Sequence, residues 1–109
     1  MQTVSELEVY SAGELTVIGF GGRPVLDHLN LAVCRDEIVE LIRENHCKTL
    51  ALDLTGVRLI PSGLLGLLAS IKRQGVTVQL YNPSADIREV LEVTKLDTLL
   101  ELHDVDVNA

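Results

Sequence analysis

The chain has few aromatic residues, the large side chains that often fill the core of a small domain. Its 109 residues include two tyrosines, one phenylalanine and no tryptophan, although 47% of them are hydrophobic. The core must therefore be built from leucine, valine and isoleucine. No apolar run approaches the roughly 18 residues of a membrane-spanning helix, and residues 1–10 lack the basic and apolar regions of a secretory signal. We expect a cytoplasmic protein that does not insert into a membrane.

Positive charge is also scarce, which limits the possible partners. Nine lysines and arginines face sixteen aspartates and glutamates, giving a formal net charge of −7, and the basic residues are scattered. Nucleic acids and anionic membranes select basic patches, so neither is an expected partner. If Cys34 and Cys47 both lie on the first helix, they are more than three helical turns apart, which is too far for a disulfide bond, so we predict free thiols.

The residues needed for metal binding or catalysis are not grouped. The three histidines show no metal-ligand spacing and have no nearby cluster of thiols or acids. No serine–histidine–aspartate set or paired carboxylates can be placed together. We therefore predict no metal, no cofactor and no enzymatic activity.

Strand and helix patterns alternate along the chain. Strands at residues 7–10 and 15–20 predict a hairpin, and a glycine-rich connection follows at residues 19–24. Three helices are expected: residues 28–45 with Asp27 as the N-cap, residues 62–74 ending before Gly75, and a third helix that begins after the cap Ser84. Further strands are expected at residues 49–54, 77–81 and 99–102. This order predicts one α/β domain over residues 1–109, with a mixed, mostly parallel sheet of about four to five strands and three main helices. Its core spans about residues 6–103, and residues 104–109 form a loose tail.

Helical spacing assigns an inner face to each helix. The predicted inner residues are Leu31, Cys34, Ile38 and Ile42 in the first helix, Leu64, Leu67, Leu68 and Ile71 in the second, and Ile87, Val90, Leu91 and Thr94 in the third. In the second helix, Leu65, Gly66, Ala69 and Arg73 then point outward. An apolar residue beside small ones makes a flat strip of the kind that docks another protein.

Two residues stand out as candidate site residues. Pro61 holds Ile60 extended, so Ser62 suits the N-cap of the second helix, where a phosphate would also be stabilised. Asp53 is an acid at the end of an otherwise buried strand, where it would face the ligand crevice of an open sheet. Its structural interpretation is a hydrogen bond to the loop backbone at Gly56 or Val57.

The stretch LDLTGVRLIPSGLLGLL at residues 52–68 resembles the central motif of STAS domains, the fold of bacterial anti-sigma factor antagonists. Residues 74–84, QGVTVQLYNPS, and 90–97, VLEVTKLD, resemble the same family in the same order. The resemblance implies that Ser62 is at the phosphoacceptor position and that Asp53 matches a frequent strand acid. Pro61 stands where the family usually has aspartate, and Gly63-Leu64 reverses its usual small-residue–glycine order.

This resemblance implies a non-enzymatic module of bacterial partner switching in transcription regulation. Its partner would be an anti-sigma factor or a serine/threonine kinase-like protein. Phosphorylation of Ser62 would control binding to this partner. The oligomeric state stays open. The expected contacts are Pro61, Ser62, Gly63, Leu65, Gly66, Ala69 and Arg73. Two alternatives remain: a STAS scaffold that is not phosphorylated, and a small-ligand sensor in a crevice formed by Asp53, Thr55, Gly21 and Gly22.

Overall fold

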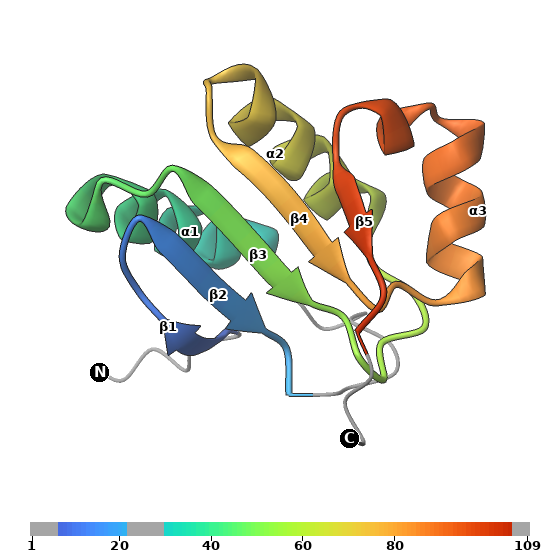
Figure 1. Cartoon of the computed structure of the whole chain (residues 1–109), viewed down its shortest axis with the longest axis horizontal. Helices are drawn as coiled ribbons and strands as arrows, with labels where there is room; N and C mark the ends of the chain where they lie inside the picture. Colours follow the sequence, from blue (N-terminus) through green and yellow to red (C-terminus); the bar gives the residue numbers. More distant parts are fainter. Residues whose placement is uncertain (1–6, 22–29, 106–109) are drawn as a thin grey trace.

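The computed structural model describes residues 7–21 and 30–105, which form a five-stranded sheet with helices on one face (Figure 1). The elements in chain order are β1 (Glu8–Ser11), β2 (Leu15–Gly19), α1 (Leu31–Asn45), β3 (Thr49–Asp53), α2 (Ser62–Arg73), β4 (Thr77–Tyr81), α3 (Ala85–Val93), the short 3₁₀ helix η1 (Leu96–Thr98) and β5 (Glu101–His103). The predicted α/β fold, with its mostly parallel sheet and three helices, is confirmed.

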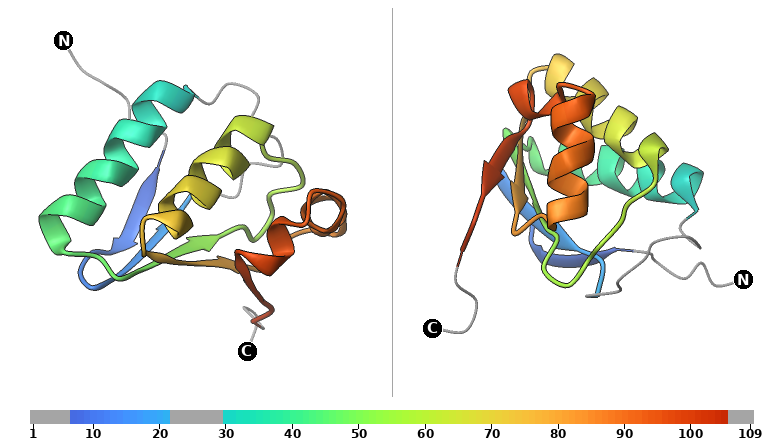
Figure 2. Two further views of the ribbon diagram at one scale, coloured as in Figure 1. Left: turned by 90° about the horizontal axis from the view of Figure 1, so that it is seen from above. Right: turned by 90° about the vertical axis from the view of Figure 1, so that its right-hand side faces the viewer.

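The strands lie side by side in the order in which they occur in the chain. β1 runs antiparallel to β2, as the predicted hairpin requires, and every later neighbour is parallel. Parallel crossovers are right-handed, so strands that are added in one direction place all their helices on the same face. Figure 2 shows this arrangement: α1, α2 and α3 cover one face, and no helix among the described residues covers the other.

The first helix begins later than the sequence pattern predicted. Its N-cap is Asn30, whose side-chain oxygen accepts a hydrogen bond of 3.1 Å from the backbone N–H of Val33. The prediction of a start at residue 28 is therefore wrong, and the proposed cap, Asp27, lies outside the described residues. The expected inner face of α1 is confirmed, because Cys34 and Ile38 are buried while Leu31 and Ile42 pack against the core.

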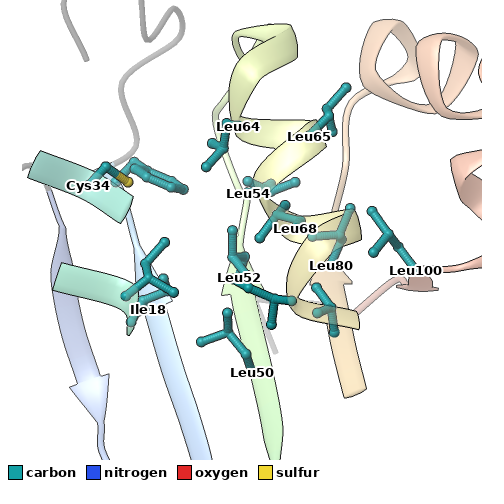
Figure 3. Packing of buried hydrophobic residues seen from close by; sticks show 14 of the residues in the cluster. Ile18, Cys34, Leu50, Leu52, Leu54, Leu64, Leu65, Leu68, Leu80 and Leu100 are labelled. Carbon is teal, nitrogen blue, oxygen red and sulfur yellow. The ribbon is translucent and has the colours of Figure 1, made fainter. Parts of the chain in front are cut away.

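The second helix is rotated relative to the prediction. Leu65 and Ala69, which were expected to point outward, are buried, whereas Leu67 is only partly buried. Figure 3 shows Leu65 in the same apolar cluster as Leu68 and Leu80. The reason lies in the neighbouring elements: α2 lies between α1 and α3 (Figure 2), and Leu67 points toward a groove left open beside α1.

The C-terminal third also differs in detail from the prediction. In α3, Ile87 and Leu91 are buried as expected, but Val90 and Thr94 are exposed because α3 packs at the end of the helical layer. The Ser84 cap is confirmed by a 3.1 Å hydrogen bond from the Ile87 N–H to its hydroxyl.

The last strand begins two residues later than predicted, because residues 96–98 first form η1. Of the predicted loose tail, Asp104 and Val105 are held in place, and residues 106–109 lie outside the described residues. Asp104 pairs with Arg88, and the backbone N–H of Val105 donates to the side chain of Asn82.

Candidate functional site

The first candidate site lies where α2 begins, at the carboxyl end of the parallel strands. Pro61, not Ser62, is the N-cap: its backbone is extended, with φ −64° and ψ 144°, and it makes no side-chain capping bond. Ser62 is the first helical residue and is exposed. The predicted capping role of Ser62 is therefore wrong, because the proline already supplies the extended residue that the helix start needs. The Ser62 hydroxyl has no hydrogen-bond partner among the described residues.

The first turn of α2 also has backbone donors available. The N–H groups of Leu64 and Leu65 both donate to the Pro61 carbonyl, at 3.0 and 3.4 Å. Those of Ser62 and Gly63 have no such acceptor within the described part of the chain. Unpaired N–H groups and the positive end of the helix dipole favour an anion at this position.

The outer face of α2 is made of small and polar residues. The exposed positions are Ser62, Gly63, Gly66, Ser70, Arg73 and Gln74. A Cβ atom at Gly66 would have no atom within 4 Å, so the surface there is open. Gly63, in contrast, lies against α1, because a Cβ on it would come within 2.6 Å of Leu31 Cδ1.

The predicted contact surface therefore changes in two ways. Ser62, Gly63, Gly66 and Arg73 are exposed and Pro61 is half-buried, but Leu65 and Ala69 belong to the core. Leu59 was not among the predicted contact residues, but its side chain is 44% exposed just before the helix. The available signal was an apolar residue in the loop between a buried strand and a helix start.

The second candidate site surrounds Asp53 at the end of β3. Its Oδ1 atom accepts hydrogen bonds from the Thr55 N–H at 3.0 Å and the Thr55 hydroxyl at 2.6 Å. Asn82 Nδ2 donates to the same hydroxyl oxygen at 2.9 Å. The interpretation that Asp53 bonds the following loop is confirmed, but its partner is Thr55 and not Gly56 or Val57.

Asp53 also lines a hollow on the helix-free face of the sheet. The hollow has a volume of about 260 Å³, and its lining includes Tyr10, Val17, Ala51 and Tyr81. Partial burial raises the pKa of the Tyr10 phenol, and the negative charges of Asp53 and Glu8 raise it further. The phenol is therefore neutral at pH 7.

The glycines proposed for this crevice are not part of the hollow. Gly21 adopts a positive φ of 72°, and a Cβ on it would lie 3.2 Å from Glu8 Oε1. It does not line the hollow beside Asp53. Gly22 lies outside the described residues.

The described residues show neither a metal site nor a membrane span. Within residues 7–21 and 30–105, no three histidine, cysteine, aspartate or glutamate side chains gather where they could hold a metal ion. None of the described helices is both long enough and apolar enough to cross a bilayer.

Comparisons with known proteins agree with the geometry. A family model described as "Mlab, STAS domain" matches residues 12–101. The unphosphorylated form of the anti-sigma factor antagonist SpoIIAA is 22% identical, with a TM-score of 0.73 over 94% of this chain and 88% of that one. The phosphorylated form of SpoIIAA, described as a Bacillus cell fate determinant, is 20% identical, with a TM-score of 0.68 over 94% and 93%.

A STAS domain protein from Planctomyces limnophilus gives a similar result. It is 21% identical, with a TM-score of 0.69 over 95% of this chain and 94% of that chain. At these identities the structural likeness establishes the fold alone. The chain matches no curated protein sequence.

Proposed function

Since the chain belongs to the STAS domain family, we propose that it is a non-enzymatic regulatory module of the bacterial cytoplasm, resembling the anti-sigma factor antagonists. It engages an anti-sigma factor or a serine kinase through the start and outer face of α2. Phosphorylation of Ser62 controls this association. The observation that carries the proposal is the exposed Ser62 hydroxyl, which has no partner among the described residues and lies beside the open surface at Gly66.

The position of Ser62 suits a phosphate without a change of fold. A phosphoserine adds a charge of about −1.5 to −2 at pH 7. At the first position of α2, this charge lies beside unpaired backbone N–H groups, which stabilise it. The same charge would face a docked protein directly, so the modified form releases a partner that the unmodified form binds.

The surface around Ser62 also suits docking. Gly66 and Ser70 present little side-chain volume, so a partner can approach the helix backbone closely. Leu59 contributes an exposed apolar side chain at one end of this surface. Arg73 is exposed near the other end and adds a positive charge to a chain whose formal net charge is −7.

Phosphorylation of Ser62 is tested by intact-mass measurement. The purified protein is incubated with Mg-ATP and each anti-sigma kinase from the host genome, and its intact mass is measured. We expect the mass of one phosphate on wild type and on Ser70→Ala, but none on Ser62→Ala. Ser70 is the matched control because it is exposed on the same face of the same helix. If no kinase modifies Ser62 although a partner binds, the chain is a scaffold that is not phosphorylated.

Binding is tested with charge variants at the same two serines. Ser62→Asp should weaken association with the anti-sigma partner at least tenfold in calorimetric titrations, while Ser70→Asp should weaken it less. Gly66→Lys should also block docking, because its side chain enters the open surface without meeting the core. Full affinity in both Ser62→Asp and Gly66→Lys would show that the partner binds elsewhere.

A further inference from the structure

One row of residues crosses the helix-free face of the sheet near the carboxyl ends of its parallel strands. The register pairs Glu8 with Gly19, Gly19 with Asp53, Asp53 with Tyr81, and Tyr81 with His103. Side chains of paired residues point to the same face of a sheet. Asp53 therefore lies in the middle of this row, between Gly19 and Tyr81.

Gly19 leaves the space that Tyr10 occupies. A Cβ atom on Gly19 would lie 2.5 Å from the Tyr10 hydroxyl oxygen and 2.8 Å from its ring carbon Cζ. Tyr10 therefore lies directly over β2 and forms one wall of the hollow beside Asp53.

Tyr81 forms a second wall and is held by its neighbours. Its hydroxyl donates a hydrogen bond of 2.9 Å to Gln79 Oε1, and its ring stacks on His103 with the centroids 5.0 Å apart. Ala51, the other β3 residue that lines the hollow, is small and leaves the space between the tyrosines open. The hollow is thus preformed, with two aromatic walls and a mainly apolar lining.

Asp53 supplies the only charge among the described residues that line this hollow. Its Oδ1 atom is held by the two hydrogen bonds from Thr55, which fix the orientation of the carboxylate. Its Oδ2 atom has no hydrogen-bond partner within the described part of the chain. No lysine or arginine of the described residues lines the hollow to neutralise it.

We propose that this hollow binds a compact organic cation, a protonated amine or an amidinium on a flat apolar body, with Asp53 as its counter-ion. A positive charge is attracted by the free carboxylate oxygen and, where it lies over an aromatic ring, by Tyr10 or Tyr81 in the wall of the hollow. The volume of about 260 Å³ lies just below the usual ~300–1,000 Å³ of ligand pockets, so the ligand is small. An anionic ligand would meet Asp53 and the nearby Glu8, and no lysine or arginine among the described lining residues would compensate for this repulsion.

The test uses benzamidine, with benzamide as a neutral probe of nearly the same shape and benzoate as an anionic one. Each is titrated into ¹⁵N-labelled protein, and amide shifts give both affinity and location. We expect benzamidine to shift the amides of Gly19, Ala51, Asp53 and Asn82, and to bind at least tenfold more tightly than benzamide. Equal binding of the two probes, or benzamidine shifts confined to other residues, would overturn the proposal.

Charge-matched variants separate Asp53 from the overall negative charge. Asp53→Asn should weaken benzamidine binding at least tenfold, whereas Glu101→Gln, which removes a carboxylate from β5 outside the hollow, should change it less than twofold. If Asp53→Asn does not fold, Tyr10→Leu removes one exposed aromatic wall and should weaken binding at least threefold. Unchanged affinity in the folded variants would contradict the proposal.

This site is independent of the proposed phosphorylation. Ser62 is exposed on α2 in the helical layer, whereas the hollow lies on the helix-free face. Ser62→Ala should therefore bind benzamidine with wild-type affinity. The failure of one proposal would leave the other intact.

Discussion

At the scale of single residues, the backbone determines how the candidate site residues are presented. The Ser62 hydroxyl makes no capping hydrogen bond because Pro61 takes the N-cap position. Asp53 is oriented by Thr55, and Tyr10 fits over the sheet because residue 19 has no Cβ. Ser62 and Asp53 were predictable as candidate site residues from their places at a helix start and a strand end. Tyr10 was not predictable, because only the strand register brings that residue beside Asp53.

Two glycines of the α2 region should respond in opposite ways to alanine. A Cβ at either Gly66 or Gly75 would have no atom within 4 Å, so neither substitution causes a clash. Gly66 lies inside the helix, where alanine is favoured by about 1 kcal/mol. Gly75 has a φ of 102°, a conformation that a side chain disfavours by roughly 1–2 kcal/mol.

Urea unfolding of both variants measures this difference. Gly66→Ala should raise the free energy of unfolding by about 1 kcal/mol, and Gly75→Ala should lower it by at least as much. Destabilisation by Gly66→Ala would show that the outer face of α2 is covered, and its role as a docking surface would be lost.

At the scale of secondary structure elements, periodicity identified each helix but did not fix its rotation. In α2 the apolar residues cover more than half of the helix circumference, so two overlapping inner faces fit the same sequence. The choice depends on the groove beside α1, which leaves Leu67 partly exposed, while Leu65 is buried on the other side. Contacts between elements that are distant in the chain do not affect the local spacing of apolar residues, so this spacing could not predict the rotation of α2. The Ser84 cap was predictable because its hydrogen bond lies within one turn.

The rotation of α2 is tested by comparing two neighbouring leucines. Leu65 is 4% exposed, so Leu65→Ala should cost roughly 2–5 kcal/mol of unfolding free energy. Leu67→Ala should cost clearly less, because its side chain is only partly buried. Leu68→Ala serves as the fully buried reference. If urea unfolding showed a larger loss of stability for Leu67→Ala than for Leu65→Ala, the inner face predicted from helical spacing alone would be correct.

At the scale of the whole molecule, the topology separates two surfaces and brings both candidate sites to one edge. β3 ends at Asp53 on the helix-free face, and residues 54–61 lead from there to Ser62 in the helical layer. Open parallel sheets bind ligands at the carboxyl ends of their strands, and both sites follow that rule. The alternating patterns predicted the mostly parallel sheet but not the order of its strands. The hollow depends on which side chains meet across strands, so it could not be predicted either.

The net charge gives a prediction for the molecule as a whole. With a formal net charge of −7, the folded chain repels itself, and this repulsion destabilises the compact state. Salt shortens the Debye length from about 30 Å at 0.01 M to about 8 Å at 0.15 M. Added NaCl over this range should therefore raise the melting temperature.

The matched variant is Glu44→Gln combined with Glu92→Gln, two exposed positions whose substitution changes the formal net charge from −7 to −5. In 0.01 M NaCl it should melt at a higher temperature than wild type, because less repulsion remains to be relieved. For the same reason its melting temperature should rise less with salt. Calorimetric melts of wild type and variant at both salt concentrations measure how much salt changes the melting temperature of each protein. A melting temperature that falls with added salt in both proteins would mean that attractive ion pairs, such as Arg88–Asp104, outweigh the repulsion from the net charge, because salt screens and weakens such pairs.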